Sequence, residues 1–149
     1  MKNLLRRYLE FNHWANSQYI QSISNDGITN DKIHWWMSHN LNAQHTWQCR
    51  LQNKATKYKV FQVHPMNDWQ AIEDDIYQEG LHLLDTIDLD QDFNYQSTSG
   101  TKYQDKVKDV FLHFVDHSSY HRGQIAAKYR ELGLEPLRTN FIHWTRTQV

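Results

Sequence analysis

Cysteine and the residues that interrupt regular structure are scarce in this sequence. Its 149 residues include one cysteine, two prolines and five glycines. The single cysteine, Cys49, excludes an internal disulfide framework and a cysteine-rich zinc module, and it is typical of a reducing compartment. Few prolines and glycines favour long helices, because these two residues break helices and strands most strongly.

Long apolar runs are also missing. No segment approaches the roughly 20 apolar residues that a membrane-spanning helix needs, and the opening apolar stretch is too short for a signal peptide. We therefore expect a cytoplasmic protein that has no membrane partner.

The sequence has no excess of charge of one sign. Its 16 lysines and arginines balance 17 aspartates and glutamates, which gives a net charge of -1 at pH 7. The basic residues are scattered, and the last predicted helix mixes Lys106 and Lys128 with Asp105 and Glu131. Because there is no basic stripe, we expect no nucleic-acid partner.

Tryptophan and histidine are abundant instead, with 6 and 10 residues. Large aromatic side chains can build a core from few residues. Trp35 and Trp144 have no evident place in the core of one bundle, and exposed apolar groups of this kind often mark self-association. The aromatic excess therefore predicts a homodimer.

Apolar residues recur at steps of three and four in four segments of the chain, a spacing typical of amphipathic helices. The four segments are 2–23, 31–53, 67–88 and 105–132. A different, alternating pattern occupies 92–104. With its Ser99-Gly100 turn, this pattern predicts a short β-hairpin before the last long helix.

The tail, 137–149, is expected to form one or two helical turns that pack Phe141 and Trp144 back onto the body of the protein. No repeat or linker divides the chain. The sequence therefore predicts an all-α protein of one domain, 1–149, built as a four-helix bundle with the hairpin before its last long helix. Bundles hold metal and ligand sites between facing helices, so polar residues that face inward are the candidates.

Three histidines lie at intervals of four residues within HFVDHSSYHRGQ (113–124): His113, His117 and His121. Residues four apart share one face of a helix and lie about 6 Å apart along its axis, so two such imidazoles can share one metal ion. His121 falls within the apolar stripe of this helix, His117 at its edge and His113 further round. His117 and His121 are therefore the pair expected to face inward.

One further histidine can join this pair from the second helix. His39 lies on the flank of that helix's apolar stripe, whereas His45 is nearly opposite and is expected to be solvated. Three neutral imidazoles, from His39, His117 and His121, leave positions on a divalent ion for water or substrate. This is the pattern of a catalytic metal site.

The other histidine arrangements are weaker candidates. His13 and His64 are expected at the surface or at its boundary. Glu79 and His82 form one Glu-x-x-His motif, but di-iron bundles use two such motifs with inward carboxylates from other helices. No second motif and no inward carboxylate is evident in this sequence, so a di-iron site is not expected.

Several polar residues are candidates to support the site. His113 or Asp116 can orient a ligand histidine through a hydrogen bond. Asn12 and Arg122 are candidates for substrate contact; a buried packing role for Asn12 and an exposed helical position for Arg122 are the alternatives. Cys49 has no evident base on its helix face, so we do not expect it to act as a nucleophile. No catalytic residue is assigned.

The segment FVDHSSYHRGQIAAKYRELGLEPLRTNFIHW (114–144) resembles the signature of the DinB family, also described as DinB/YfiT-like metalloenzymes. Its HSSYHRGQ core is the most specific part. FNHWANSQ, SHNLNAQHTWQCRL and YQSTSG resemble the same family, so the resemblance spans nearly the whole chain. It implies a four-helix bundle in the family's up-down-down-up arrangement, with a divalent metal held by His39, His117 and His121.

Family members with established activity resemble thiol S-transferases and isomerases that use bacillithiol, mycothiol or glutathione. Together with the open three-histidine pattern, this resemblance favours a metal-dependent enzyme of the thiol S-transferase or hydrolase type. It implies a zinc or nickel ion, a small-molecule substrate and a low-molecular-weight thiol as cosubstrate. The alternative is a non-enzymatic metal-binding bundle of a stress response. A fourth protein ligand favours this alternative, because it closes the metal to substrate.

Overall fold

The computed structural model describes residues 1–97 and 99–146; Thr98 in the predicted hairpin and 147–149 in the predicted tail lie outside the described residues. The long helices are α1 (Lys2–Asn25), α2 (Asp31–Leu51), α3 (Trp69–Thr86) and α4 (Val107–Glu131). The shorter elements are η1 (Met66–Asp68), β1 (Asp92–Gln96), β2 (Lys102–Lys106) and α5 (Phe141–Thr145). The predicted all-α class with one short hairpin is confirmed.

Local signals explain where these elements begin, turn and end. The Asn30 side chain accepts hydrogen bonds from the backbone N–H groups of Lys32 and Ile33 at the start of α2. The antiparallel strands β1 and β2 are joined through Gly100, whose φ of 88° is a conformation that favours glycine. Gly133, with a φ of 74°, follows α4 and ends it in the same way.

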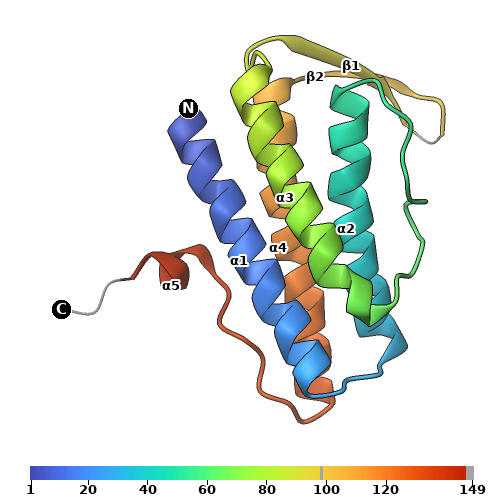
Figure 1. Ribbon diagram of the computed structural model, residues 1–149, viewed down its shortest axis with the longest axis vertical. Helices are drawn as coiled ribbons and strands as arrows, with labels where there is room; N and C mark the ends of the chain where they lie inside the picture. The colour runs from blue at the N-terminus through green and yellow to red at the C-terminus, as the bar shows by residue number, and fades with distance from the viewer. Residues whose placement is uncertain (98, 147–149) are drawn as a thin grey trace.

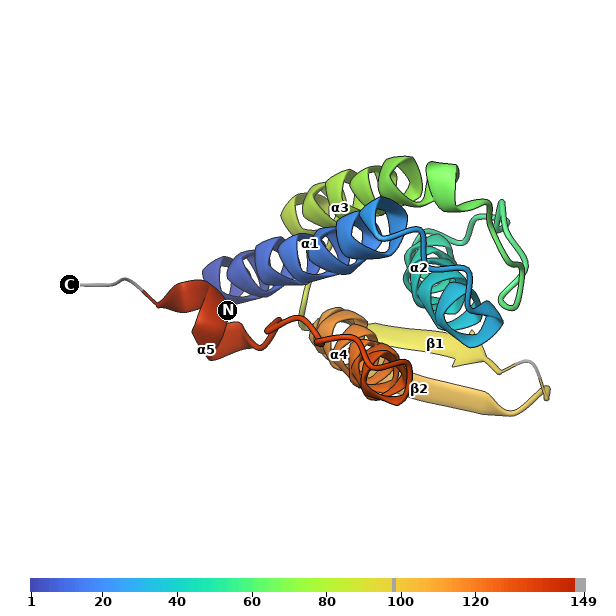
Figure 2. The ribbon, with the colours of Figure 1, turned by 90° about the horizontal axis from the view of Figure 1, so that it is seen from below.

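The four long helices lie side by side (Figure 1), and Figure 2 shows the same packing from below. α1 packs against α3 and α4, and α2 packs against the same two helices. The chain runs one way in α1 and α4 and the opposite way in α2 and α3, because the connection 52–65 returns along α2 (Figure 1). Among the described residues, no helix is both long and apolar enough to cross a bilayer.

The tail packs onto α1, as predicted. The Phe141 ring stacks on Tyr8 with 4.8 Å between ring centroids. The Trp144 ring lies 6.0 Å from that of Phe11 and is half-buried. Trp144 therefore has a place within this chain, whereas Trp35 is 37% exposed.

The interior contains two apolar clusters with a polar layer between them. One cluster surrounds Tyr19, Ile33 and Trp69, and the other surrounds Leu84 and Phe111 near the hairpin. The polar layer consists of eight buried side chains: Asn12, Asn16, Asn40, Gln44, Gln48, Glu73, Ser118 and Arg122. Buried polar groups cost free energy unless they are hydrogen-bonded, so this layer indicates where a site can lie.

Candidate metal centre

Three histidines meet between α2 and α4: His39 from α2 and His117 and His121 from α4. One nitrogen of each ring lies within 4.8 Å of the others. The Nε2 atoms of His117 and His121 are 3.2 Å apart. Two imidazole nitrogens on one tetrahedral zinc ion lie about 3.3 Å apart, because each Zn–N bond is about 2.05 Å long. The structure thus brings together the three histidines selected from the sequence, at a spacing that fits one ion.

Hydrogen bonds to the outer ring nitrogens fix the tautomers of two of these histidines. His121 donates its Nδ1–H to Oε1 of Gln124 at 2.6 Å, and His39 donates its Nδ1–H to the backbone oxygen of Val60 at 3.2 Å. A neutral imidazole has one N–H, so both Nε2 atoms carry lone pairs that can bind a metal. The Phe61 ring stacks on His39 at 5.4 Å between centroids and restrains it further.

Burial keeps two of the three histidines, His117 and His121, neutral. The pKa of His117 is lowered to about 3, first by burial and then by the neighbouring histidine rings. Burial likewise lowers the pKa of His121. A metal ligand must be a neutral imidazole, because a protonated nitrogen has no lone pair to donate. Both rings are therefore in the form that binds metal at neutral pH.

The connection between α2 and α3 helps to orient His39. The Asn42 side chain donates from Nδ2 to the backbone oxygens of Gln62 at 2.7 Å and Val60 at 3.4 Å. Its Oδ1 accepts the Nε2–H of His64 at 2.6 Å. These bonds hold the connection on α2 and fix the Val60 oxygen that accepts the His39 proton.

Asn42→Ala is expected to lower the zinc affinity of the protein by about 10- to 100-fold, the usual effect of losing a group that supports a metal ligand. Without the Asn42 amide, the Val60 oxygen is no longer held beside His39. Competition with a chromogenic chelator measures the affinity. Gln78→Ala, which removes an exposed amide on α3, should leave the affinity unchanged. Unchanged affinity in Asn42→Ala would contradict this role of the connection.

His64 is buried, with 4% of its surface exposed, so its expected place at the surface or boundary is wrong. Its backbone N–H is donated to Oγ of Ser38 at 3.0 Å, and its backbone oxygen accepts Nε1–H of Trp69 at 3.2 Å. Burial lowers its pKa. Nothing in the sequence indicated this burial, because His64 lies in a connection without a periodic apolar pattern. The path of that connection depends on its contacts with α2.

His64→Gln is expected to lose less stability than the parent when the pH falls from about 7 to 5. An unfolded histidine takes up a proton near pH 6.5, so below that pH the unfolded parent binds a proton that buried His64 does not. The free energy of unfolding of the parent therefore decreases as the pH falls toward the lowered pKa. Denaturation of chelator-treated protein measures this slope, and the exposed His82→Gln should keep the parent slope. Equal slopes in all three proteins would contradict the prediction.

His113 and Asp116 lie beside the cluster without joining its hydrogen bonds. The His113 ring is 5.3 Å from that of His117, and burial lowers its pKa. Asp116 is exposed. Within the described part of the chain, neither accepts a hydrogen bond from a cluster histidine. Gln124 and Val60 do so instead. Of these two acceptors, only Gln124 could have been identified from the sequence, because residues three apart on a helix lie side by side.

Asn12 and Arg122 belong to the buried polar layer. Arg122 is 3% exposed and donates from Nη1 to the Oδ1 atoms of Asn12 at 2.7 Å and Asn16 at 2.6 Å. The alternative of an exposed helical arginine is therefore wrong, because α1 packs over this face of α4. Burial lowers the pKa of Arg122 to about 10, so the guanidinium remains charged at neutral pH.

A buried carboxylate, Glu73 on α3, completes this layer. It is 1% exposed, and its Oε2 accepts Nδ2–H of Asn16 at 3.0 Å. His13 Nδ1 lies 3.4 Å from Oε1, and Glu73 raises the pKa of His13. Burial raises the pKa of Glu73 itself. The expectation that no carboxylate faces inward is wrong: Asn16 links Glu73 to Arg122.

Cys49 does have a base on its helix face, contrary to expectation. Its Sγ lies 3.5 Å from Nε2 of His45, which is half-buried rather than solvated. The backbone N–H of Lys57 already donates to this nitrogen at 3.0 Å. Burial raises the pKa of the thiol and lowers that of the imidazole. The pair therefore stays neutral, and Cys49 is not activated as a nucleophile.

The sequence matches the model of the DinB family over residues 1–148, essentially the whole chain. No curated protein matches it. The family resemblance inferred from HSSYHRGQ and the segments around it is thereby confirmed. The structure also brings His39, His117 and His121 close enough to hold one metal ion. This proximity follows from the fold and does not depend on the family match. This chain belongs to the DinB family.

Proposed function

We propose that this DinB-family protein binds a divalent metal ion through His39, His117 and His121 and acts as a metal-dependent enzyme of the thiol S-transferase or hydrolase type. The convergence of three ring nitrogens within 4.8 Å carries the proposal. Among the described residues, no carboxylate or thiol joins the cluster as a fourth ligand. Three protein ligands leave a position for water or substrate, as catalytic zinc sites do and structural ones do not.

The residues of the chain hold the ion and keep its ligands in the right form. Three imidazoles suit zinc or nickel, the ions proposed here. When bound, such an ion supplies Lewis acidity, which lowers the pKa of a thiol or a water and yields a nucleophile at neutral pH. Val60 and Gln124 accept the outer protons of His39 and His121, and so keep their Nε2 atoms free. A low-molecular-weight thiol is the proposed cosubstrate, and a small electrophile is the proposed substrate.

We also propose that α1 to α4 form the family's up-down-down-up four-helix bundle as a single domain, 1–149. The opposite directions of the pair α1 and α4 and the pair α2 and α3 support this arrangement (Figure 1). It places the three histidines on two neighbouring helices, where the rigidity of the packed helices limits their movement.

Turnover distinguishes an enzyme from a protein that only binds metal. Protein reconstituted with zinc or nickel is incubated with bacillithiol or glutathione and monochlorobimane, and separately with p-nitrophenyl acetate as a test of hydrolysis. Turnover that requires the metal and is absent from the His117→Ala, His121→Ala double variant would support the proposal. Stoichiometric metal without turnover of these compounds would favour the non-enzymatic stress-response bundle.

We further propose that the protein is a homodimer. The exposed Trp35 and Phe61, 37% and 66% accessible, stack on each other and form an apolar surface that a second copy can cover. Sedimentation equilibrium at micromolar concentration is expected to give the mass of two 18.0 kDa chains. The mass of one chain would contradict the proposal.

A further inference from the structure

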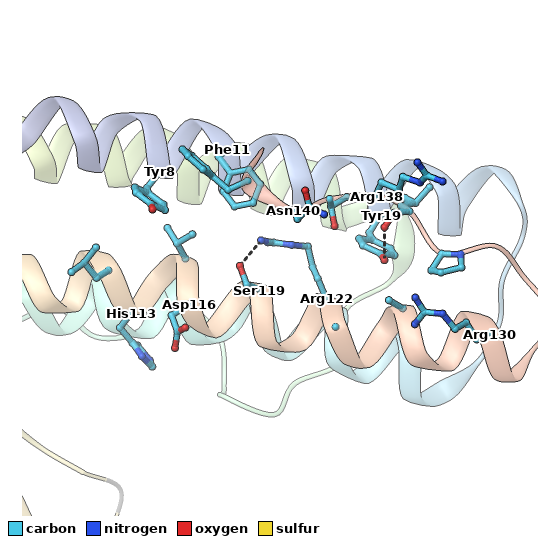
Figure 3. A pocket seen from close by; sticks show the side chains of 18 of the residues that line it. Tyr8, Phe11, Tyr19, His113, Asp116, Ser119, Arg122, Arg130, Arg138 and Asn140 are labelled. Carbon is cyan, nitrogen blue, oxygen red and sulfur yellow. Dashed lines mark hydrogen bonds between the residues drawn. The ribbon is translucent and has the colours of Figure 1, made fainter. Parts of the chain in front are cut away.

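A cavity of about 950 Å³ lies between α1, α4 and the chain that links α4 to α5 (Figure 3). This volume is typical of sites for small molecules. None of His39, His117 and His121 lines it, although His113 does so at one end. The cavity is therefore separate from the candidate metal centre.

The cavity has arginines along much of its length. Arg122, Arg130 and Arg138 line it, and Arg130 and Arg138 lie at the end opposite Asp116 (Figure 3). Across residues 1–97 and 99–146, none of the three arginines forms an ion pair with a carboxylate. Three carboxylates also line the cavity, those of Asp109, Asp116 and Glu135. In this part of the chain, none of them pairs with these arginines. Arg130 and Arg138 are exposed and thus available to a ligand, whereas Arg122 is buried beside them and contributes its charge.

Arg122 is the strongest sign that the ligand is an anion. Its guanidinium is buried, yet its hydrogen-bond acceptors are the neutral side-chain oxygens of Asn12, Asn16 and Ser119. The Glu73 carboxylate connects to it only through the Asn16 amide. A buried charge without an opposite charge in contact costs free energy. An anion in the cavity would supply that charge.

One part of the cavity wall is aromatic and aliphatic. Tyr8 stacks on Phe141 at 4.8 Å between centroids, and Phe11 meets Phe141 edge to face at 5.3 Å. Leu112 and Val115 of α4 line the same cavity. Such a wall suits the flat hydrocarbon part of a ligand, because aromatic rings favour stacked and edge-to-face contacts.

We propose that this cavity binds a small organic anion. Its carboxylate or phosphate group lies at the end of the cavity that Arg130 and Arg138 line, where the buried charge of Arg122 adds to the attraction, and its apolar body lies against the aromatic wall. Arginine suits this task because its planar guanidinium presents paired N–H donors to two oxygens of one oxyanion. Occupation of the cavity requires no metal ion, so this site goes beyond the function proposed for the histidine cluster.

An NMR titration at fixed ionic strength tests this site with three probes: phenylacetate, phenyl phosphate and the neutral phenylacetamide. At least one anion is expected to bind at least tenfold more tightly than the amide, because only an anion presents a negative charge and two equivalent oxygens to a guanidinium. The tighter anion identifies the preferred oxyanion. The double variant Arg130→Gln, Arg138→Gln alters two exposed side chains and should weaken anion binding about tenfold or more.

Two control variants assign the binding to the cavity. Arg7→Gln removes an exposed arginine of α1 outside the cavity and should keep the parent affinity. The His117→Ala, His121→Ala variant should also keep it, whereas a loss there would place the anion at the metal centre and overturn the proposal. Equal binding of phenylacetamide and both anions, unchanged anion binding in the arginine double variant, or no saturable binding of either anion would overturn it too.

Discussion

Replacing His117 and His121 together by alanine is expected to reduce the metal content of the protein from near one ion per chain to near zero. The substitutions leave His39 as the last imidazole of the cluster, and a single side-chain ligand does not hold a divalent ion in competition with water. Metal analysis of gently purified protein, before and after reconstitution with zinc or nickel, measures the effect.

The matched control for this experiment is the double variant His82→Ala, His143→Ala. It removes two exposed histidines outside the cluster and should retain the metal content of the parent. Metal retained without His117 and His121 would place the site elsewhere, and a parent that takes up no metal would refute the proposed centre. Neither result would bear on the anion cavity, because occupation of that cavity requires no metal ion.

The largest loss of stability is expected from Arg122→Met. The substitution removes the guanidinium that donates to Oδ1 of Asn12. It also removes the positive charge that is linked to the Glu73 carboxylate by hydrogen bonds through Asn16. Leaving a buried acceptor without its donor costs about 1–3 kcal/mol, and the loss of the positive charge near buried Glu73 adds to this cost. Chemical denaturation measures the free energy of unfolding.

Two further variants test whether this loss comes from the buried network. Arg7→Met shortens an exposed arginine of α1 and should change the stability little. Adding Glu73→Gln to Arg122→Met should cost less than the sum of the two single effects, because a neutral amide needs no compensating charge. Strictly additive effects would mean that Glu73 and Arg122 act independently despite the Asn16 bridge.

Much of the fold and the candidate metal ligands could be predicted because both depend on local patterns. The three- and four-residue apolar spacing located the helices, and glycines such as Gly133 marked their ends. The same helical period indicated which faces carry His39, His117 and His121. The His45 prediction failed by the same method, because the Lys57 segment of the following connection covers that face and bonds its imidazole.

Only the tertiary structure decided which polar groups meet one another. A helical period shows which face of α4 is apolar, but it does not show that α1 places Asn12 and Asn16 against Arg122. His64 is buried because the connection folds back onto α2, where it bonds Asn42, 22 residues earlier in the chain. Hydrogen bonds of this kind join residues far apart in sequence and depend on how the packed elements approach, so no local pattern specifies their partners.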